Sequence, residues 1–248
     1  MTNYSQVTGS GDFNIGALIS ESFAVLHRAL PRFLALGLIP IIPLIFSTLV
    51  VGASAPGELP SNFGAGVFLV LLYIILLFAI QGGMIYGAFS ELRGQSFAVG
   101  DALSKGFARF LPLLGVSILT GLLVLIGSAL FLAPGLWLLC ILYSAVAVCV
   151  VEQRGVFDSM SRSGELTSGY RWRILGLVLI VFIASIVTSS IIEYVVGSVG
   201  GPLFGSLLAN LFQVYLTALS CVLSALVYYR LRSIKEGIDI DRLADVFD

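Results

Sequence analysis

The chain has 248 residues, of which 58% are hydrophobic and only 11% are charged, with a formal net charge of −1 and a mean hydropathy of +1.04. Soluble domains carry about 25% charged residues, so this composition excludes an ordinary soluble fold. The longest polar segment is also too short for a separate soluble domain.

The thirteen Lys and Arg residues fall in four segments, and the stretches between those segments are long enough to cross a bilayer as helices. We therefore predict an all-α polytopic membrane protein with one integral membrane domain, 1–248, and six transmembrane helices that form three hairpins. The residues 132–137 are expected to be the tight turn of the second hairpin. The predicted spans are 33–53, 66–90, 111–132, 136–151, 174–196 and 203–229.

A stretch with an apolar face of helical period precedes each predicted hairpin: Asp12 to Leu30, Gly100 to Phe110 and Val156 to Leu166. We expect three amphipathic interfacial helices, the first capped by Asp12. Their apolar faces are expected to contain Ile15, Leu18, Ile19, Phe23, Leu26 and Leu30, then Leu103, Phe107 and Phe110, then Val156, Phe157, Met160 and Leu166.

Each of these stretches ends in a basic–aromatic step into a span, namely Arg32-Phe33, Arg109-Phe110 and Arg171-Trp172. The pattern indicates three repeats with approximate limits 12–92, 99–153 and 156–231. The alternative is that any span entry collects arginine and aromatic residues at the membrane interface. In both interpretations the candidate ligands of lipid headgroups are Arg32, Arg109, Arg171 and Arg173.

The basic residues all fall on one side of the membrane when six spans are threaded through it. The positive-inside rule then predicts that both termini are cytoplasmic. The tail, 230–248, begins basic and ends acidic with an apolar stripe, which is typical of a short helix docked on the protein or on a partner.

Polar residues within the spans are candidates for function because an amide or carboxylate in lipid needs a partner. Gln81 and Gln213 lie at similar predicted depth and could bond each other or a substrate, with Asn210 one turn from Gln213. Glu193, near the outer end of the fifth span, could relay protons, bind a cation or simply reach water. The competing interpretation is that hydrogen bonds of the two glutamines only hold the helices together.

Other features indicate packing and bending. Pro40 and Pro43 are expected to kink the first span. Gly83-x-x-x-Gly87, Gly201-x-x-x-Gly205 and Ser220-x-x-x-Ser224 have the spacing of close helix contacts. The three cysteines lie in apolar stretches, where they are expected to act as small packing residues: Cys140, Cys149 and Cys221.

The sequence contains no motif that is typical of an enzyme active site. His27 is the single histidine, and no metal-ligand spacing, phosphate-binding loop or dinucleotide fingerprint occurs. We therefore expect no enzyme activity, no catalytic or metal site and no cofactor. The expected partners are membrane lipids, with another membrane protein or a second copy of the chain as open alternatives, and no nucleic acid.

Two segments resemble a known family. Residues 150–163 (VVEQRGVFDSMSRS), with Gly169 to Gly176 after them, and residues 227–237 (VYYRLRSIKEG) are similar to bacterial six-span proteins labelled glycerophosphoryl diester phosphodiesterase membrane domains, or YciC-like. The resemblance implies the fold and a bacterial cytoplasmic (inner) membrane. It does not imply phosphodiesterase activity, because that chemistry belongs to a separate soluble barrel that this sequence does not contain.

Three functions are compatible with the sequence. The first is a non-enzymatic membrane module that organises lipids or partner proteins, motivated by the three basic amphipathic helices. The second is a small transporter or channel for an apolar or amphipathic solute, motivated by the repeat pattern, the prolines of the first span and the two glutamines. The third is an intramembrane enzyme that acts on lipid. A cavity that reaches the middle of the membrane would favour the second.

Overall fold

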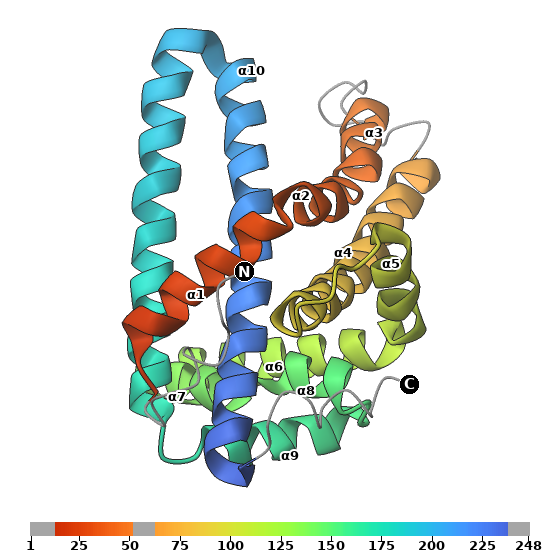
Figure 1. Cartoon of the computed structure of the whole chain (residues 1–248). Coiled ribbons are helices and arrows are strands. Elements are labelled where there is room, and N and C mark those ends of the chain that lie inside the picture. Colours follow the sequence, from red (N-terminus) through yellow and green to blue (C-terminus); the bar gives the residue numbers. More distant parts are fainter. Residues whose placement is uncertain (1–12, 52–62, 238–248) are drawn as a thin grey trace.

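A computed structural model describes residues 13–51 and 63–237, and every regular element within those ranges is a helix (Figure 1). The prediction of an all-α fold is confirmed. The helices are α1 (Ile15–Arg28), α2 (Leu30–Leu38), α3 (Ile41–Val51), α4 (Phe63–Leu92), α5 (Val99–Ala108), α6 (Phe110–Leu130), α7 (Leu132–Leu142), α8 (Ala145–Val151), α9 (Val156–Thr167) and α10 (Arg171–Glu236).

Six helical segments are long and apolar enough to cross a membrane, and they form three hairpins. The first hairpin joins α2 and α3 to α4, the second joins α6 to α7 and α8, and the third is α10 itself, which reverses at Gly201 (φ 81°, ψ 166°). We call Arg171–Ile192 the first arm of α10 and Leu208–Glu236 its second arm. The prediction of a multi-pass protein with six spans is confirmed.

The first span is interrupted where the prolines predict a kink. Helix α2 ends at Leu38 and α3 begins at Ile41, because Pro40 lacks the N–H that a continuous helix needs. Pro43 lies in the first turn of α3, where its missing donor costs nothing. The span begins at Leu30, earlier than the predicted residue 33.

The turn of the second hairpin lies earlier than predicted. Phe131 alone is extended (φ −158°, ψ 148°), and α7 begins at Leu132 within the stretch assigned to the turn. Pro134 falls in the first turn of α7, a position that tolerates proline, so it does not delay the helix. Gly135 allows the close approach to α6, since a Cβ there would overlap Ser128.

Helices α1, α5 and α9 are present as predicted, and most residues of their predicted apolar faces, such as Leu18, Leu26 and Leu166, are buried or packed against the core. Small residues form much of the buried side, whereas Phe23, Phe107 and Phe157 are exposed, the last by 77%. The expected cap of α1, Asp12, lies outside the described residues, and the side chain of Asn14 accepts from the N–H groups of Gly16 and Ala17 instead. The buried small residues are Ser22, Ala102, Gly106, Ser159, Ser163 and Thr167.

The entry into each hairpin has the same backbone geometry. The residue before the first span is Ala29, Arg109 or Tyr170, with φ between −118° and −111° and ψ between 3° and 24°. The residues four and seven positions later are fully buried in all three hairpins: Phe33, Leu113, Ile174, Leu36, Val116 and Leu177.

This common geometry is what a repeat would produce, and the repeat limits themselves stay a prediction. The basic–aromatic steps do not occupy equivalent places in it. Arg109 is the residue before the span, Arg171 is the first residue of its span and Arg32 is the third.

Helices α5 and α6 pack on α4, the second span of the preceding hairpin. A Cβ on Gly83 would lie 2.6 Å from the carbonyl oxygen of Ala102, and a Cβ on Gly82 would overlap Leu113. The predicted close contact of the Gly83-x-x-x-Gly87 face is therefore confirmed, because both glycines lie against α5 or the segment before it.

The other hairpins repeat this arrangement and close a ring. The hydroxyl of Ser163 on α9 donates to the carbonyl of Ile141 on α7 (2.7 Å), and the first arm of α10 contacts α7. Helices α1 and α2 pack on the second arm of α10, through the pair Glu21–Arg230 (2.9 Å) and through Gly37. Each preceding helix and first span thus packs on the second span of the hairpin before it, and the first hairpin packs on the last.

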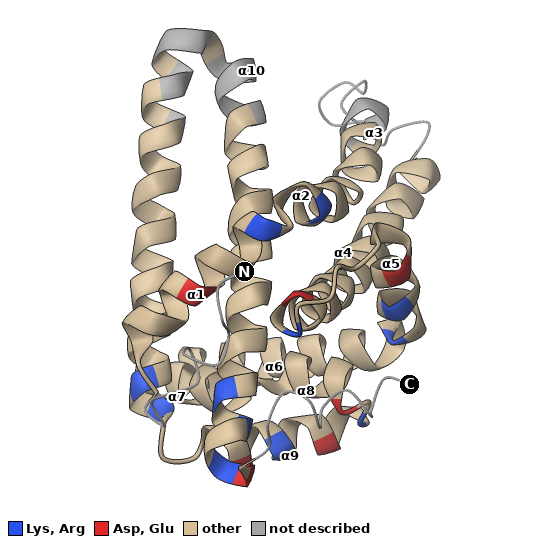
Figure 2. Cartoon of the chain, in the orientation of Figure 1, with Lys and Arg blue, Asp and Glu red and all other residues tan. Residues whose placement is uncertain are grey.

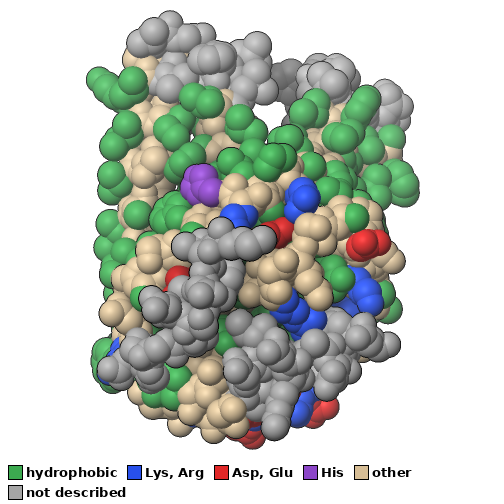
Figure 3. All heavy atoms as spheres, in the orientation of Figure 1, with side chains coloured by type: hydrophobic (Ala, Val, Ile, Leu, Met, Phe, Trp, Pro, Cys, Tyr) green, Lys and Arg blue, Asp and Glu red, His purple; other side chains and the backbone are tan. Residues whose placement is uncertain are grey.

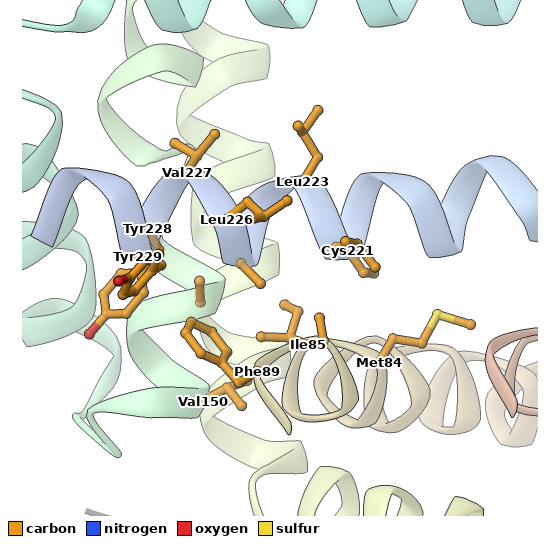
Figure 4. Packing of buried hydrophobic residues seen from close by; sticks show 14 of the residues in the cluster. Met84, Ile85, Phe89, Val150, Cys221, Leu223, Leu226, Val227, Tyr228 and Tyr229 are labelled. Atoms are coloured by element: carbon orange, nitrogen blue, oxygen red, sulfur yellow. The ribbon is translucent and has the colours of Figure 1, made fainter. Parts of the chain in front are cut away.

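The second spans meet in the centre of this ring. Figure 4 shows Ile85 and Phe89 of α4 facing the second arm of α10, with Val150 of α8 beside them. The rings of Phe89 and Tyr228 meet edge to face, with centroids 5.6 Å apart. The contact between hairpins one, two and three therefore forms around α4, α8 and the second arm.

Gly106 gives a direct test of the α4–α5 contact. A Cβ at this position would overlap the carbonyl oxygen of Ala79, so Gly106→Ala is expected to lower the free energy of unfolding by about 1–3 kcal/mol. Gly100 is in the same helix and has no atom within 4 Å of its Cβ position, so Gly100→Ala is expected to stabilise slightly. Thermal unfolding of both variants measures the difference, and equal melting temperatures would contradict the contact.

Charged side chains gather on one side of the molecule (Figure 2). The described side chains at the opposite ends of α3, α4 and α10 carry no charge. We call the side with the ion pairs the charged side.

Candidate functional site

A cavity of about 650 Å³, open to the surface over part of its lining, lies between α4, the junction of α7 and α8, and both arms of α10. It is in the range of about 300–1,000 Å³ that is usual for ligand sites. We call it the polar cavity, because most of its lining side chains carry a hydroxyl or an amide: Gln81, Tyr143, Ser185, Ser189, Ser190, Gln213, Thr217, Ser220 and Ser224.

A second cavity of about 420 Å³ lies between α2, α3, α4, α6 and the second arm. We call it the apolar groove, because aliphatic and aromatic side chains form most of its lining. In Figure 3 the molecule is open between the upper part of α10 and the α3–α4 side. The two cavities share three lining residues, Gln81, Gln213 and Thr217.

The local sequence turns Gln81 toward the second arm. The next two residues, Gly82 and Gly83, face α6 and α5, so the glutamine lies on another side of α4, with Ile85 one turn later. On the second arm, Gln213, Thr217, Ser220 and Ser224 recur at helical spacing and line the polar cavity together.

The prediction that Gln81 and Gln213 lie at one depth agrees with their shared cavities, but they do not bond each other. Neither side-chain amide makes a hydrogen bond within the described part of the chain. Asn210 lies one turn from Gln213 and lines the apolar groove. Glu193 belongs to α10, but its side chain lies outside the described residues.

The serines of α10 are the site residues that the sequence reading missed. Ser220 and Ser224 were expected to pack closely against a helix, and they line the polar cavity instead. Ser185 and Ser189 face them from the first arm at the same helical spacing. The recurrence of hydroxyl residues on one face of each arm is the signal in the sequence that could have found them.

Two hydroxyls that line the cavities donate to backbone carbonyls, and a third has no hydrogen-bond partner among the described residues. Ser185 donates to the carbonyl of Val181 (2.6 Å) and Thr217 donates to the carbonyl of Gln213 (2.9 Å). Both hydroxyl oxygens keep the ability to accept. Ser117 lines the apolar groove, and its buried oxygen has no hydrogen-bond partner among the described residues. A buried polar atom without a hydrogen-bond partner is unusual in proteins.

The candidate headgroup ligands Arg32 and Arg109 both contact the protein. Arg32 pairs with Glu91 (3.1 Å) while 42% of its side chain stays exposed. The guanidinium of Arg109 donates to the backbone carbonyl of Gln153 (3.1 Å). These bonds link α2 to α4, and the residue before α6 to the segment after α8.

Arg171 and Arg173 lie at the start of α10. Arg171 lies over the ring of Trp137 at 5.3 Å, and Arg173 donates to the backbone carbonyl of Phe13 (3.3 Å). All four candidate arginines thus have protein partners. Contact of any of them with lipid headgroups stays a prediction.

The buried carboxylate of Glu152 lies at the charged side of the ring of hairpins. Only 7% of the Glu152 side chain is exposed. Its oxygens pair with Arg154 (2.7 Å) and Arg162 (3.4 Å) and accept from the hydroxyl of Tyr228 (2.9 Å). Tyr228 is one turn beyond Ser224, so this cluster lies next to the polar cavity.

The same cluster continues along the second arm. Arg232 donates to the hydroxyl of Tyr228 (2.8 Å) and pairs with Glu236 (2.9 Å), and Glu236 also pairs with Arg162. We call the six residues the charged network: Glu152, Arg154, Arg162, Tyr228, Arg232 and Glu236. It ties α8, α9 and the second arm together at the charged side.

The described residues contain no group of three or more His, Cys, Asp or Glu that could hold a metal ion. The three cysteines are free and buried, in agreement with a packing role. No family model, no curated protein and no solved structure matches this chain.

Proposed function

We propose that this protein is a small transporter that passes an uncharged solute through the membrane by way of the polar cavity. The observation that carries the proposal is a cavity of about 650 Å³ between the spans, lined by hydroxyls and by two amides that make no hydrogen bond within the described residues. Polar groups inside a membrane are costly unless they have partners. A hydrogen-bonding solute would supply those partners.

The ring of hairpins supports this proposal. Transporters commonly hold their solute between repeated units near the middle of the bilayer. The polar cavity contacts the second spans of all three hairpins, and the charged network lies beyond it at one end. In this arrangement the charged side is closed, and passage requires that the charged network separate.

The proposed location is the cytoplasmic membrane of a bacterium, with both termini and the charged side in the cytoplasm. The positive-inside rule supports the orientation. The resemblance of residues 150–163 and 227–237 to the six-span family supports the location. The proposed action is passage without chemical change, because none of the described lining residues is a histidine or carboxylate that could activate a serine.

A lipid- or partner-organising module is the second candidate function. It is supported by large apolar side chains that are exposed next to the charged side: Phe107 by 45%, Phe157 by 77% and Trp172 by 73%. Such residues suit the boundary between headgroups and acyl chains. This role is compatible with transport and uses a different surface.

Reconstitution into liposomes tests the proposed transport. Two uncharged probes are suitable: glycerol, followed by vesicle swelling, and NBD-labelled monoacylglycerol, followed by dithionite quenching. The wild-type protein is expected to accelerate at least one of them over empty liposomes. Ser220→Trp, which fills the polar cavity, is expected to remove at least nine-tenths of that acceleration, on the order of 1.4 kcal/mol.

Leu125→Trp is the matched control, since Leu125 is 66% exposed on α6 and does not line either cavity. It is expected to retain the wild-type rate. Absence of acceleration for both probes, or equal rates for the two tryptophan variants, would contradict the proposed function.

A further inference from the structure

We infer that the two cavities together bind one amphipathic molecule, with an uncharged, hydroxylated head in the polar cavity and a hydrocarbon chain in the apolar groove. This inference rests on the proposed function, because the bound molecule is the solute that the protein moves.

The first argument is that the cavities adjoin. Gln81, Gln213 and Thr217 line both, so a ligand can extend from one into the other past these side chains. The polar cavity is the larger one and the richer in hydroxyls, which suits the head. Both volumes fall within the range of about 300–1,000 Å³ found for sites of small molecules.

The second argument concerns charge. None of the described residues that line either cavity is Asp, Glu, Lys, Arg or His. A charged head in a low-dielectric site needs a countercharge or a dense set of hydrogen bonds to offset its lost hydration. A head without charge does not have this requirement, so the lining selects against phosphate and sulfate.

The third argument concerns hydrogen bonding. The hydroxyls of Ser185 and Thr217 have already donated to backbone carbonyls, so they present acceptor oxygens. The amides of Gln81 and Gln213 present donors as well as acceptors. A ligand hydroxyl both donates and accepts, so a head with several hydroxyl groups can satisfy both kinds of partner.

The fourth argument concerns the chain. Apart from the shared polar residues, the groove is lined chiefly by apolar side chains from α3 and α4, including Leu44, Leu77 and Phe78. The ligand class is therefore a neutral lipid with one chain and a polyol head.

Photo-crosslinking tests this assignment in lipid nanodiscs. The probe is 1-monooleoylglycerol with a diazirine at the end of its chain, and the labelled peptides are identified by mass spectrometry. Labelling is expected on segments that line the groove, around Leu44 or around Leu77 and Phe78. Labelling spread over exposed residues of α6, such as Leu122 and Leu125, would overturn the inference.

Competition with unlabelled compounds tests the head. Monooleoylglycerol is expected to reduce labelling at least tenfold more effectively than methyl oleate, which lacks hydroxyls, or oleyl phosphate, which carries charge. Equal competition by all three would overturn the assignment of the head. Glycerol alone is expected to compete weakly because it has no chain.

A pair of variants separates the chain site from transport. Leu44→Trp fills the groove and is expected to weaken labelling at least tenfold, whereas Ile45→Trp, next to it and 49% exposed, is expected to label like the wild type. Equal labelling of these variants would overturn the chain site. Selective labelling without protein-dependent transfer would leave this inference standing and contradict the proposed function. Transfer of glycerol together with non-selective labelling would support the proposed function and overturn this inference.

Discussion

Replacement of Gln81 and Gln213 together by leucine is expected to lower the transfer of NBD-labelled monoacylglycerol at least tenfold. These two amides line both cavities and make no hydrogen bond within the described residues, so the solute is their expected partner. A net hydrogen bond contributes about 0.5–1.5 kcal/mol, so the loss of two, about 1–3 kcal/mol, corresponds to roughly a fivefold to hundredfold effect, a range that includes the expected tenfold. The leucine side chains also have no polar atoms, so the hydroxyls of the solute would lack hydrogen-bond partners at these positions. The measurement is dithionite quenching in proteoliposomes.

Gln95→Leu is the matched control for this double variant. Gln95 is exposed in the segment between α4 and α5, outside both cavities. Its replacement is expected to leave the transfer rate unchanged. A double variant that transfers the probe as fast as the wild type would show that the glutamines do not contact the solute.

Glu152→Gln is expected to lower the free energy of unfolding by about 3 kcal/mol. The Glu152 carboxylate is 93% buried by side-chain area, since 7% is exposed, and it holds Arg154, Arg162 and Tyr228. Removal of one member of a buried ion pair costs about 3–5 kcal/mol, and we expect the lower end because Arg162 keeps its pair with Glu236 and 47% of the Arg154 side chain is exposed. For a chain of this size 1 kcal/mol corresponds to about 2–4 °C, so the melting temperature should fall by roughly 6–12 °C.

Glu165→Gln serves as the comparison. Glu165 also pairs with Arg162, at 3.4 Å, but 65% of its side chain is exposed. Exposed pairs contribute about 0–1 kcal/mol, so this variant should melt within a few degrees of the wild type. If both glutamine variants melt together, the charged network does not hold α8, α9 and the second arm.

The six spans could be predicted from the sequence because charge is excluded from lipid, and the gaps between charges therefore mark the helices. The small residues on the inward faces of α5 and α9 could not be predicted to be buried. Lipid tails are as apolar as a protein interior, so hydrophobicity does not distinguish Phe107 or Phe157, which are exposed, from core residues. Small residues such as Gly106 and Ser163 mark the contacts instead, since they allow backbones to approach.

The candidate site was predictable only in part. A glutamine within a span is unusual enough to attract notice, so Gln81 and Gln213 could be named from the sequence. The polar cavity also depends on the closure of the ring, in which Gly37 meets the second arm from far along the chain. The helical periodicity of the sequence does not predict a contact between residues so far apart in the chain. From the sequence alone, the serines of α10 could therefore indicate either close helix packing or a cavity. The position of both arms beside α4 distinguishes the two.

The most direct test of the central claim is the reactivity of single cysteines toward a membrane-impermeant, uncharged glucosyl methanethiosulfonate in proteoliposomes. The background has Cys140, Cys149 and Cys221 replaced by alanine. Ser185→Cys faces the polar cavity, and Ile183→Cys, in the same arm, faces outward with 57% of Ile183 exposed. A water-accessible cavity predicts that Ser185→Cys reacts at least tenfold faster than Ile183→Cys. Equally slow reaction of both thiols would mean that no water reaches this part of the molecule, and would contradict the account.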